Sequence, residues 1–352
     1  MGKLALRRKP TLKDVAEKAG VSVQTVLRYY KNTNISPITH KHIGTTIKEL
    51  NYRPNAAARS LRRQETLTIG LAIYHKEYIG DSNNAFFPLL LQGLVPVVGA
   101  HGYNLQILET DPKAVLHKRS IYYKEKVLDR GVDGLIVVDS IISDEEIMEL
   151  EKERIAFVVV RRLLQKMPGR CVIPDEHAKV YRLGKFLLER GHRRIAYFGI
   201  EKKFIETTHS LQGLSAALAE YGAKLDERDM VLTQTEGVAM AAMEAILSRD
   251  DAPTAAICTT DFLTDMLTRR LLHGLAVPKG FEYAGETPRP ENVLSKNFVY
   301  GVKPVGRKLG YEAGEVLIEL LANGVEHTKP CVVEVGEFAQ ARGKLGGILK
   351  DV

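Results

Sequence analysis

Apolar and polar positions alternate with two different periods along this chain. Beyond residue 65, short apolar runs alternate with longer stretches that have a helical period. The predicted strands are Leu67–Ile73, Asn104–Leu108, Gly134–Val138, Ala156–Val160, Ile195–Gly199 and Ala255–Thr259. Helical patterns lie near residues 86–100, 113–130, 143–153, 176–190, 208–221, 237–248 and 262–273. Apolar strands that alternate with helices predict an α/β fold with parallel sheets.

The length of this part predicts two lobes. The chain has 352 residues, and the part beyond residue 65 is longer than one hydrophobic core usually sustains. Ligands in parallel sheets bind at the carboxyl ends of the strands, so we expect a binding cleft between the lobes.

The first 51 residues carry the pattern of three short helices. Thr11 and Asp14 form a capping box that starts the first helix, and Gly20 is suited to end it. Ser22 can cap a second helix, and Ser36 followed by Pro37 can start a third. The turn between the first two helices is short and contains glycine, which predicts a helix-turn-helix.

Charge separates the same two parts. Residues 1–64 contain 14 Lys and Arg against Asp14, Glu17 and Glu49, a net charge of +11, whereas the remainder has a net charge of −4. A solvated basic tail is one explanation. The folded pattern of this basic part favours a nucleic acid partner instead.

Several classes of protein are disfavoured. No apolar run approaches the roughly 20 residues that span a bilayer, and the basic start has no apolar signal core. The cysteines Cys171, Cys258 and Cys331 lie far apart, which argues against a zinc ribbon or a disulfide framework and favours a cytoplasmic location. Nucleotide-binding, metalloprotease and hydrolase motifs are missing, so we predict no enzyme, no cofactor and no metal site.

The segments TLKDVAEKAGVSVQTVLRYYKN, ELNYRPNAAARSLRR and TIGLAI resemble the headpiece, hinge and first body strand of the lactose-repressor (LacI/GalR) family of bacterial transcription regulators. The resemblance continues through NNAFFPLLLQGL, RGVDGLIVV, RGHRRIAYFG and PTAAICTTDFLTD, so it covers nearly the whole chain. It implies a helix-turn-helix headpiece followed by a two-lobed, periplasmic-binding-protein-like α/β domain with parallel sheets.

The resemblance also implies where the domains lie. We expect the headpiece at 1–51 and a hinge helix with its linker at 52–65. The first lobe is expected at 66–161 and 302–324, and the second at 162–301 and 325–352. These boundaries place the three passages between lobes near 162, 301 and 325.

The second helix of a helix-turn-helix enters the major groove with its first residues. Gln24 suits adenine, Arg28 suits guanine, and Val23 offers an apolar contact. Ser and Thr hydroxyls are expected either to contact phosphates or only to cap helices. The predicted DNA-binding residues are Thr11, Ser22, Val23, Gln24, Thr25, Arg28, Lys31, Ser36, Thr39, Tyr52, Asn55, Ala58 and Leu61. Lys31 and Leu27 depart from the residues usual in the family, which leaves the operator sequence open.

The hinge segment is too short to hold a helix alone in water, because helix nucleation is costly. It resembles a helix that orders on DNA beside its twin. Leu61 lies among Arg59, Arg62 and Arg63, which is the pattern of an apolar wedge entering the minor groove. Packing of Leu61 on the body is the alternative.

Four residues match effector-binding positions of the family, namely Phe86, Phe87, Arg162 and Asp261, and Asp175 is a further candidate. The phenylalanines could instead be core, Asp261 a helix cap, and Arg162 a surface residue. Gly285-Glu286-Thr287-Pro288 stands where the family has Gly-Phe-Asp-Asp, and Ser210 stands where an arginine is frequent. These departures leave the effector unidentified.

We expect a repressor that binds a near-palindromic operator as a homodimer under control of a small carbohydrate effector. A sugar-binding or sugar-modifying protein with an incidental basic arm is one alternative. A constitutive DNA-binding protein with a decayed pocket is the other.

Overall fold

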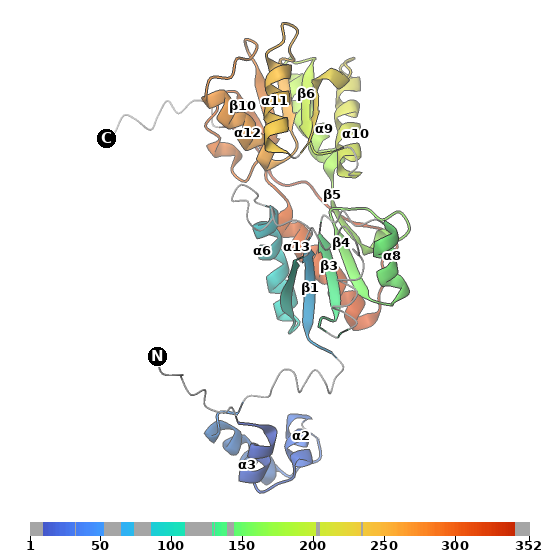
Figure 1. Cartoon of the computed structure of the whole chain (residues 1–352), viewed down its shortest axis with the longest axis vertical. Helices are drawn as coiled ribbons and strands as arrows, with labels where there is room; N and C mark the ends of the chain where they lie inside the picture. The colour runs from blue at the N-terminus through green and yellow to red at the C-terminus, as the bar shows by residue number, and fades with distance from the viewer. Residues whose placement is uncertain are drawn as a thin grey trace, which may run out of the picture. The chain divides into compact units, whose positions relative to one another are not determined.

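Two compact units make up the chain, Met1–Thr66 and Leu67–Val352. The computed structural model describes residues 10–31, 33–52, 65–73, 86–109, 129, 131–138, 144–201, 205–233 and 235–341. Most of the hinge predicted at 52–65, and nearly all of the helix predicted near 113–130, lie outside these residues. Figure 1 shows the first unit as helices alone and the second as sheets flanked by helices.

The first unit is the predicted three-helix headpiece, formed by α1 (Leu12–Lys18), α2 (Val23–Lys31) and α3 (Pro37–Glu49). The capping box that starts α1 is present, because the Thr11 hydroxyl accepts from the Asp14 backbone N–H and the Asp14 carboxylate accepts from the Thr11 N–H at 2.6 Å. The core of the unit consists of Val15, Ala16, Ala19, Val26, Ile43 and Tyr52. The helix caps and the apolar positions, which can be recognised in the local sequence, therefore define the three helices of this unit and their core.

The first lobe of the α/β body is built on a parallel sheet with the strand order β11-β5-β4-β3-β1-β2. Its strands are β1 (Thr68–Ile73), β2 (Asn104–Glu109), β3 (Gly134–Val138), β4 (Ala156–Val160), β5 (Cys171–Pro174) and β11 (Cys331–Val333). Helices α6 (Phe86–Ala100) and α13 (Gly306–Asn323) pack on one face, and α8 (Asp144–Lys152) packs on the other. A short 3-10 helix, η1 (Pro168–Arg170), precedes β5.

The second lobe repeats this arrangement with the strand order β12-β10-β9-β8-β6-β7. Its strands are β6 (Ile195–Gly199), β7 (Met230–Leu232), β8 (Ala255–Cys258), β9 (Glu282–Glu286), β10 (Phe298–Val302) and β12 (Phe338–Gln340), of which only β12 is antiparallel to its neighbour among the described strands. Helices α9 (Glu176–Glu189) and α10 (Ile205–Glu220) cover one face, and α11 (Glu236–Leu247) and α12 (Asp261–Leu272) cover the other. The 3-10 helices η2 (Glu227–Asp229) and η3 (Pro290–Asn292) precede β7 and β10.

Two of the three predicted passages between lobes are wrong. The chain leaves the first lobe after β5 and not near residue 162, because β5 pairs with β4. It leaves that lobe again after β11 and not near residue 325, because β11 pairs with β5. The return between Val302 and Gly306 lies beside the predicted position, 301. Strands β5 and β11 are short, so their apolar runs do not stand out from the neighbouring sequence.

Helices α6 and α13 approach each other closely through glycine. A Cβ atom on Gly93 of α6 would collide with the backbone carbonyl of Arg307, and one on Gly310 of α13 would collide with the carbonyl of Leu90. Larger residues would therefore force the helices apart. Helix α13 begins immediately after the chain returns from the second lobe, so this contact fixes the position of its first turn at the boundary between the lobes.

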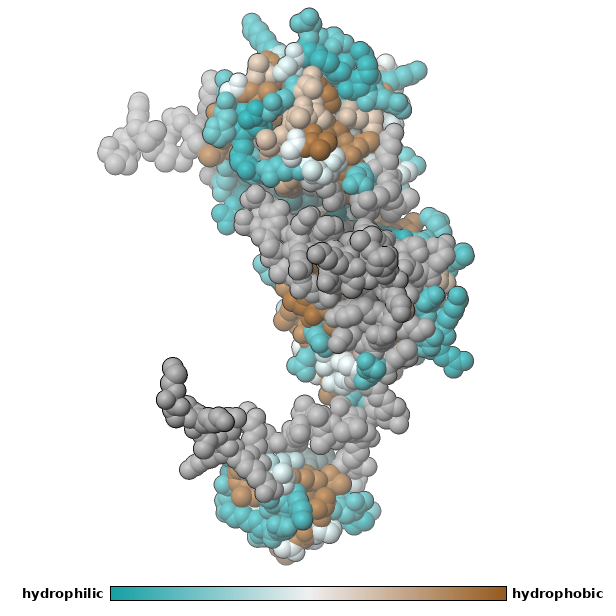
Figure 2. Space-filling view, viewed as in Figure 1, coloured by the Kyte–Doolittle hydropathy of each residue, from teal (hydrophilic) through white to brown (hydrophobic). Residues whose placement is uncertain are grey.

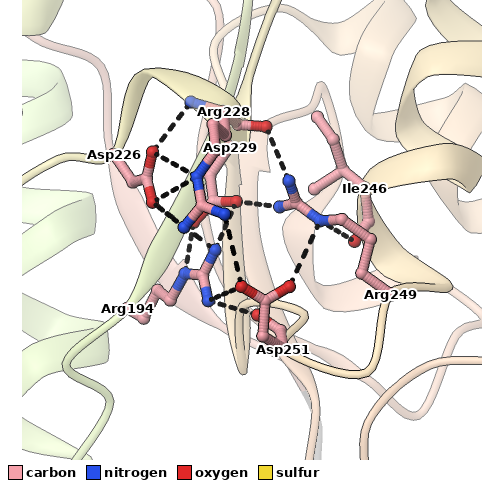
Figure 3. A network of polar contacts seen from close by, with 7 residues as sticks. All are labelled: Arg194, Asp226, Arg228, Asp229, Ile246, Arg249 and Asp251. Atoms are coloured by element: carbon pink, nitrogen blue, oxygen red, sulfur yellow. Dashed lines mark hydrogen bonds and ion pairs between the residues drawn. The ribbon is translucent and has the colours of Figure 1, made fainter.

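A network of charged side chains joins the amino ends of three strands in the second lobe (Figure 3). It comprises Arg194 before β6, Asp226, Arg228 and Asp229 before β7, and Arg249 and Asp251 before β8. Asp229 is completely buried and accepts from Arg194 Nε at 2.6 Å and from Arg249. Hydrogen bonds from Arg228 lower the pKa of the half-buried Asp226 to about 2. The network fixes these strands at the end opposite their carboxyl termini.

We expect Asp229→Ala to lower the free energy of unfolding by about 3 kcal/mol, because it removes the buried partner of two arginines. Asp226→Ala is the matched control, because Asp226 belongs to the same network but is partly exposed, and it should cause a much smaller loss. Urea unfolding of the full-length protein, followed by circular dichroism, measures both. Equal losses for the two variants would contradict a central role for Asp229.

Candidate functional site

Helix α2 of the headpiece presents one polar face to solvent. Val26 is completely buried among the residues of α1 and α3. Gln24 and Arg28 are exposed and stand four residues apart, so they share a face of the helix. Val23, at the start of α2, is 40% exposed. This is the part of a helix-turn-helix that can reach base edges in the major groove.

Hydroxyl side chains cap the helices of the headpiece. The Ser22 hydroxyl accepts from the Thr25 N–H at 3.1 Å, and the Ser36 hydroxyl accepts from the Thr39 N–H at 3.1 Å. Thr11 caps α1 in the same way. Thr11, Ser22 and Ser36 are also exposed, whereas Thr25 and Thr39 are half-buried. Capping is therefore observed, and the predicted phosphate contacts stay predictions.

Tyr52 is one of the predicted DNA-binding residues, and its contact with DNA stays a prediction. Only 8% of its surface is exposed, and its ring belongs to the headpiece core. An aromatic residue in this position stabilises a small core. Of the other predicted contacts, Lys31 is the last residue of α2, and its side chain is not described. Asn55, Ala58 and Leu61 lie outside the described residues.

A cavity with a volume of about 140 Å³, lined by both polar and apolar residues, lies at the carboxyl ends of the strands in the α/β body. The first lobe contributes Phe86, Arg161, Pro174, Gly306 and Leu309. The second lobe contributes the polar residues Glu176, Lys179, Tyr197, Glu206, Thr207, Ser210, Thr259, Thr260, Asp261 and Glu286. The position agrees with the cleft expected from the strand pattern.

One buried ammonium group organises the second-lobe wall of the cavity. Lys179 of α9 donates to Glu176 Oε1 at 2.8 Å, to Glu286 Oε2 at 2.9 Å and to the Thr259 carbonyl at 3.0 Å. Ser210 of α10 donates to Glu176 Oε2 at 3.0 Å. The cluster joins α9 and α10 to the ends of β8 and β9. Its three charged side chains are each mostly buried, and they carry a net charge of −1.

Burial of the cluster shifts the pKa values of its charged side chains. Desolvation alone lowers the pKa of Lys179, but attraction to Glu176 and Glu286 outweighs it and raises the pKa. Burial raises the pKa of Glu286, an effect that Lys179 opposes and that Glu176 and Asp261 reinforce. The cluster therefore holds a firmly protonated lysine beside a carboxylate whose charge is only partly compensated.

Tyr197 of β6 also lines the cavity. It is completely buried, and desolvation raises the pKa of its phenol. Its hydroxyl lies near Ser210 and Thr259, yet it makes no hydrogen bond within the described part of the chain. A buried hydroxyl in this state is unusual, because buried polar groups nearly always have a partner.

The first-lobe wall of the cavity contains Arg161 and not the predicted Arg162. Arg161 has a positive φ of 63°, and its guanidinium lies 4.6 Å from the centre of the Phe86 ring. Arg162 instead forms an ion pair with Asp144 of α8. The left-handed turn at the end of β4 rotates the chain, so the two neighbouring arginines reach different surroundings. Strain of this kind is frequent at binding sites.

Of the other predicted effector residues, Phe86 and Asp261 line the cavity, whereas Phe87 and Asp175 do not. Phe87 is buried in the first-lobe core. Asp175 caps α9, since its carboxylate accepts from the Ala178 N–H at 2.9 Å. Asp261 is the first residue of α12, which Thr260 caps, and its carboxylate accepts from the Phe262 N–H at 2.9 Å.

Sequence reasoning missed Glu176, Lys179, Tyr197, Glu206 and Thr207 as cavity residues. A signal for one of them was present, because Lys179 stands four residues before Leu183 on the apolar face of α9. A charged residue in an apolar stripe is rarely buried without a partner. The partner, Glu286, lies 107 residues away, so local patterns do not reveal it.

A helix-turn-helix joined to a two-lobed α/β body with a cavity defines a class of DNA-binding regulators. Residues 11–55 match the family described as "Bacterial regulatory proteins, lacI family". Residues 69–273, more than half of the chain, match "Periplasmic binding proteins and sugar binding domain of LacI family". The protein belongs to the lacI family of bacterial transcription regulators, and its relatives are regulators and not enzymes.

Curated relatives agree with this assignment. Catabolite control protein A of Priestia megaterium is 28% identical over 318 residues, which cover 88% of this chain and 91% of the relative. The HTH-type transcriptional repressor PurR of Vibrio atlanticus (strain LGP32) is 27% identical over 88% of this chain and 91% of its own.

Solved structures support the fold. The lac repressor dimer bound to operator and the anti-inducer ONPF gives a TM-score of 0.75 at 20% identity, covering 94% of this chain and 98% of the other. The complex of transcriptional regulator CelR with cellobiose gives a TM-score of 0.67 at 22% identity, covering 94% of this chain and 99% of the other. No helix in the described part of this chain is both long and apolar enough to cross a membrane.

Lys179→Met should lower the free energy of unfolding by about 3–5 kcal/mol at pH 7, because it leaves Glu176 and Glu286 buried without their cation. The pKa of Glu286 should then rise further, so protonation removes the charge as the pH falls. A carboxyl with a raised folded-state pKa destabilises the protein as the pH increases, so the loss should be smaller at pH 5.

Urea unfolding at both pH values measures the effect. Lys185→Met is the control, because Lys185 lies on the same helix and pairs with Glu220 at the surface. An equal loss at pH 5 and pH 7 would show that Lys179 acts by packing alone.

Proposed function

We propose that this protein is a dimeric transcriptional repressor that binds a near-palindromic operator. A small molecule bound in the inter-lobe cavity changes its affinity for that operator. The observation that carries the proposal is the exposed polar face of α2, Gln24 and Arg28, on a capped helix of a strongly basic headpiece. Relatives named as repressors, such as PurR, support the repressor role.

The DNA-binding part of the proposal assigns a role to each exposed residue of α2. Gln24 would pair with adenine, Arg28 with guanine, and Val23 would touch a thymine methyl group. Thr11, Ser22 and Ser36, exposed at helix starts, would bind phosphates, because helix N-termini attract anions. Leu61 of the hinge would enter the minor groove.

Dimerisation is supported by helix α6. Its 15 residues contain no charged side chain. Its solvent-facing positions are Pro88, Gln92, Val95, Pro96, Gly99 and Ala100. Figure 2 shows hydrophobic surface where α6 lies. Exposed apolar patches mark interaction sites, and a two-fold interface with a second copy would cover this helix and pair the headpieces on a two-fold operator.

The cavity is the proposed effector site. Its volume, about 140 Å³, resembles the roughly 150 Å³ of a cavity that admits one benzene molecule, so the site has room for a small ligand only. The CelR structure, bound to cellobiose, supports a carbohydrate-like ligand. An effector with different affinities for the DNA-bound and free states would couple the sites by typically 1–3 kcal/mol.

The alternative of a constitutive regulator with a decayed pocket has less support. Decay would remove polar side chains or leave them unpaired, whereas Lys179, Glu176, Glu286 and Ser210 form a connected hydrogen-bonded cluster in the cavity wall. Such a cluster is costly to bury unless it is complete.

Arg28→Ala should weaken the free energy of binding to the operator by about 1–3 kcal/mol and relax the base preference at one base pair in each half-site. A selection from random DNA identifies the operator, and gel-shift titrations compare it with scrambled DNA. Lys13→Ala, an exposed change on α1, is the control and should leave the preference unchanged. If Arg28→Ala weakened binding equally on every sequence, Arg28 would be a phosphate contact.

Val95→Glu should convert the dimer to a monomer, because it introduces two charges into an apolar interface. Val95 is 50% exposed in the single chain, so the fold should tolerate the change. Sedimentation of the full-length protein measures the assembly state. Val238→Glu on α11, 57% exposed, is the control and should remain dimeric. A dimer that survived Val95→Glu would place the interface elsewhere.

A further inference from the structure

One buried hydroxyl in the cavity wall lacks a hydrogen-bond partner. Tyr197 of β6 lines the cavity and is completely buried. Ser210 and Thr259 lie near its phenol oxygen, but neither they nor any other described residue forms a hydrogen bond with it. The oxygen is covered, so solvent does not supply the missing partner in this structure. A buried polar group in this state lowers stability and requires an explanation.

Gly199 directs the phenol towards the cavity. Residues i and i+2 of a strand share a face, so Gly199 follows Tyr197 on the same side of β6. A Cβ atom on Gly199 would lie 2.5 Å from the ring carbon Cε1 of Tyr197 and 2.7 Å from its phenol oxygen. The phenol therefore extends along the strand over Gly199, and its oxygen lies at the carboxyl end of β6, where the cavity is found. Any larger residue at position 199 would displace it.

A second tyrosine of the same sheet provides a comparison. Tyr283 of β9 is also completely buried, and burial raises the pKa of its phenol too. Its hydroxyl lies 2.6 Å from the Thr268 hydroxyl, so it has a partner. Tyr283 belongs to the core on the face that α11 and α12 cover, away from the cavity. Burial in this lobe therefore does not by itself leave a tyrosine hydroxyl unpaired, and the missing partner is particular to the tyrosine at the cavity.

The phenol of Tyr197 can act as a donor to an uncharged oxygen. Burial raises its pKa above the usual value of about 10, so it keeps its proton at neutral pH. Nearby donors are committed, because Lys179 has three acceptors and Ser210 donates to Glu176. Glu176 opposes a negative charge at the phenol oxygen more strongly than Lys179 favours it. An anionic ligand oxygen is disfavoured there for the same reason, whereas a sugar hydroxyl is a suitable acceptor.

We infer that Tyr197 is a specificity-determining residue of the cavity, whose hydroxyl donates a hydrogen bond to one hydroxyl oxygen of an uncharged sugar. The sugar displaces the part of the wall that covers the phenol oxygen, and the new hydrogen bond replaces the one that the fold leaves unmade. The side chain thus increases ligand affinity and lowers stability, a combination found at functional sites. The inference rests on the proposed function, because it names the residue that recognises the effector in the same cavity.

Removal of the hydroxyl should affect stability differently at the two tyrosines. In urea unfolding without sugar, Tyr197→Phe should leave the midpoint unchanged or raise it, because it removes an unpaired polar group. Tyr283→Phe is the matched control and should lower the midpoint, because it breaks the hydrogen bond with Thr268. A midpoint lowered as much by Tyr197→Phe as by Tyr283→Phe would show that the phenol has a partner within the protein, and the inference would be wrong.

Calorimetric titration of the full-length protein tests recognition. Glucose, galactose, mannose, xylose, arabinose and ribose are titrated first, and each sugar that binds is followed by its monodeoxy derivatives. With the wild type, loss of one particular hydroxyl should weaken binding ten-fold or more, because a site that hydrogen-bonds a hydroxyl rejects the analogue without it. Tyr197→Phe should bind the parent sugar ten-fold or more weakly, and should bind that deoxy derivative as tightly as the parent sugar. Tyr283→Phe should retain the wild-type pattern.

Three results would overturn the inference. The first is an unchanged affinity of Tyr197→Phe for the parent sugar. The second is the same pattern of losses over the deoxy derivatives in Tyr197→Phe and in the wild type, since the phenol would then recognise no hydroxyl. The third is binding of none of these sugars by the wild type.

DNA binding separates this inference from the proposed function. If the protein selects an operator and Tyr197→Phe recognises sugars as the wild type does, the role of Tyr197 is wrong and the regulatory function stands. If no operator is selected, the proposed function is wrong, whatever the cavity binds.

Discussion

The second lobe depends on one buried ammonium group. Lys179 is only 7% exposed, so its charge requires compensation, which comes from two carboxylates and a backbone carbonyl. These partners come from the start of α9 and from the ends of β8 and β9. Moving any of these elements would leave a charge buried without its partner. The geometry of the cavity wall is therefore tied to the requirement to neutralise this lysine.

The same lobe is fixed at both ends of its sheet by charge. At the amino ends, the buried Asp229 holds Arg194 and Arg249 (Figure 3). At the carboxyl ends, the lysine cluster faces the cavity. The first lobe is held differently, by the close approach of α6 and α13 at glycine and by its apolar cores. The cavity lies between the second-lobe wall, which carries the lysine cluster, and the first-lobe wall, which carries Phe86 and Arg161.

The headpiece distributes its residues between stability and recognition. Hydroxyls at the helix starts satisfy backbone N–H groups and are exposed at the same time, so a single residue can serve both purposes. Gln24 and Arg28 do not cap a helix, which makes them the clearest candidates for base contacts. Tyr52 illustrates the opposite case, because its ring closes the core of a unit too small to lose an aromatic residue.

The sequence by itself determined the features that depend on neighbouring residues. Caps such as Thr11 and Ser36, the glycine turn and the helical periods define the headpiece, and the apolar runs define the longer strands. Phe86 and Asp261 were predicted from their match to effector-binding positions of the family, and both line the cavity. Only the tertiary structure decided that Arg161 and not Arg162 lines the cavity, since a left-handed residue at the end of β4 turns the chain. It also decided the pairing of Lys179 with Glu286, because side chains 107 residues apart meet only when two parallel strands and a helix have packed, and no local pattern encodes that distance.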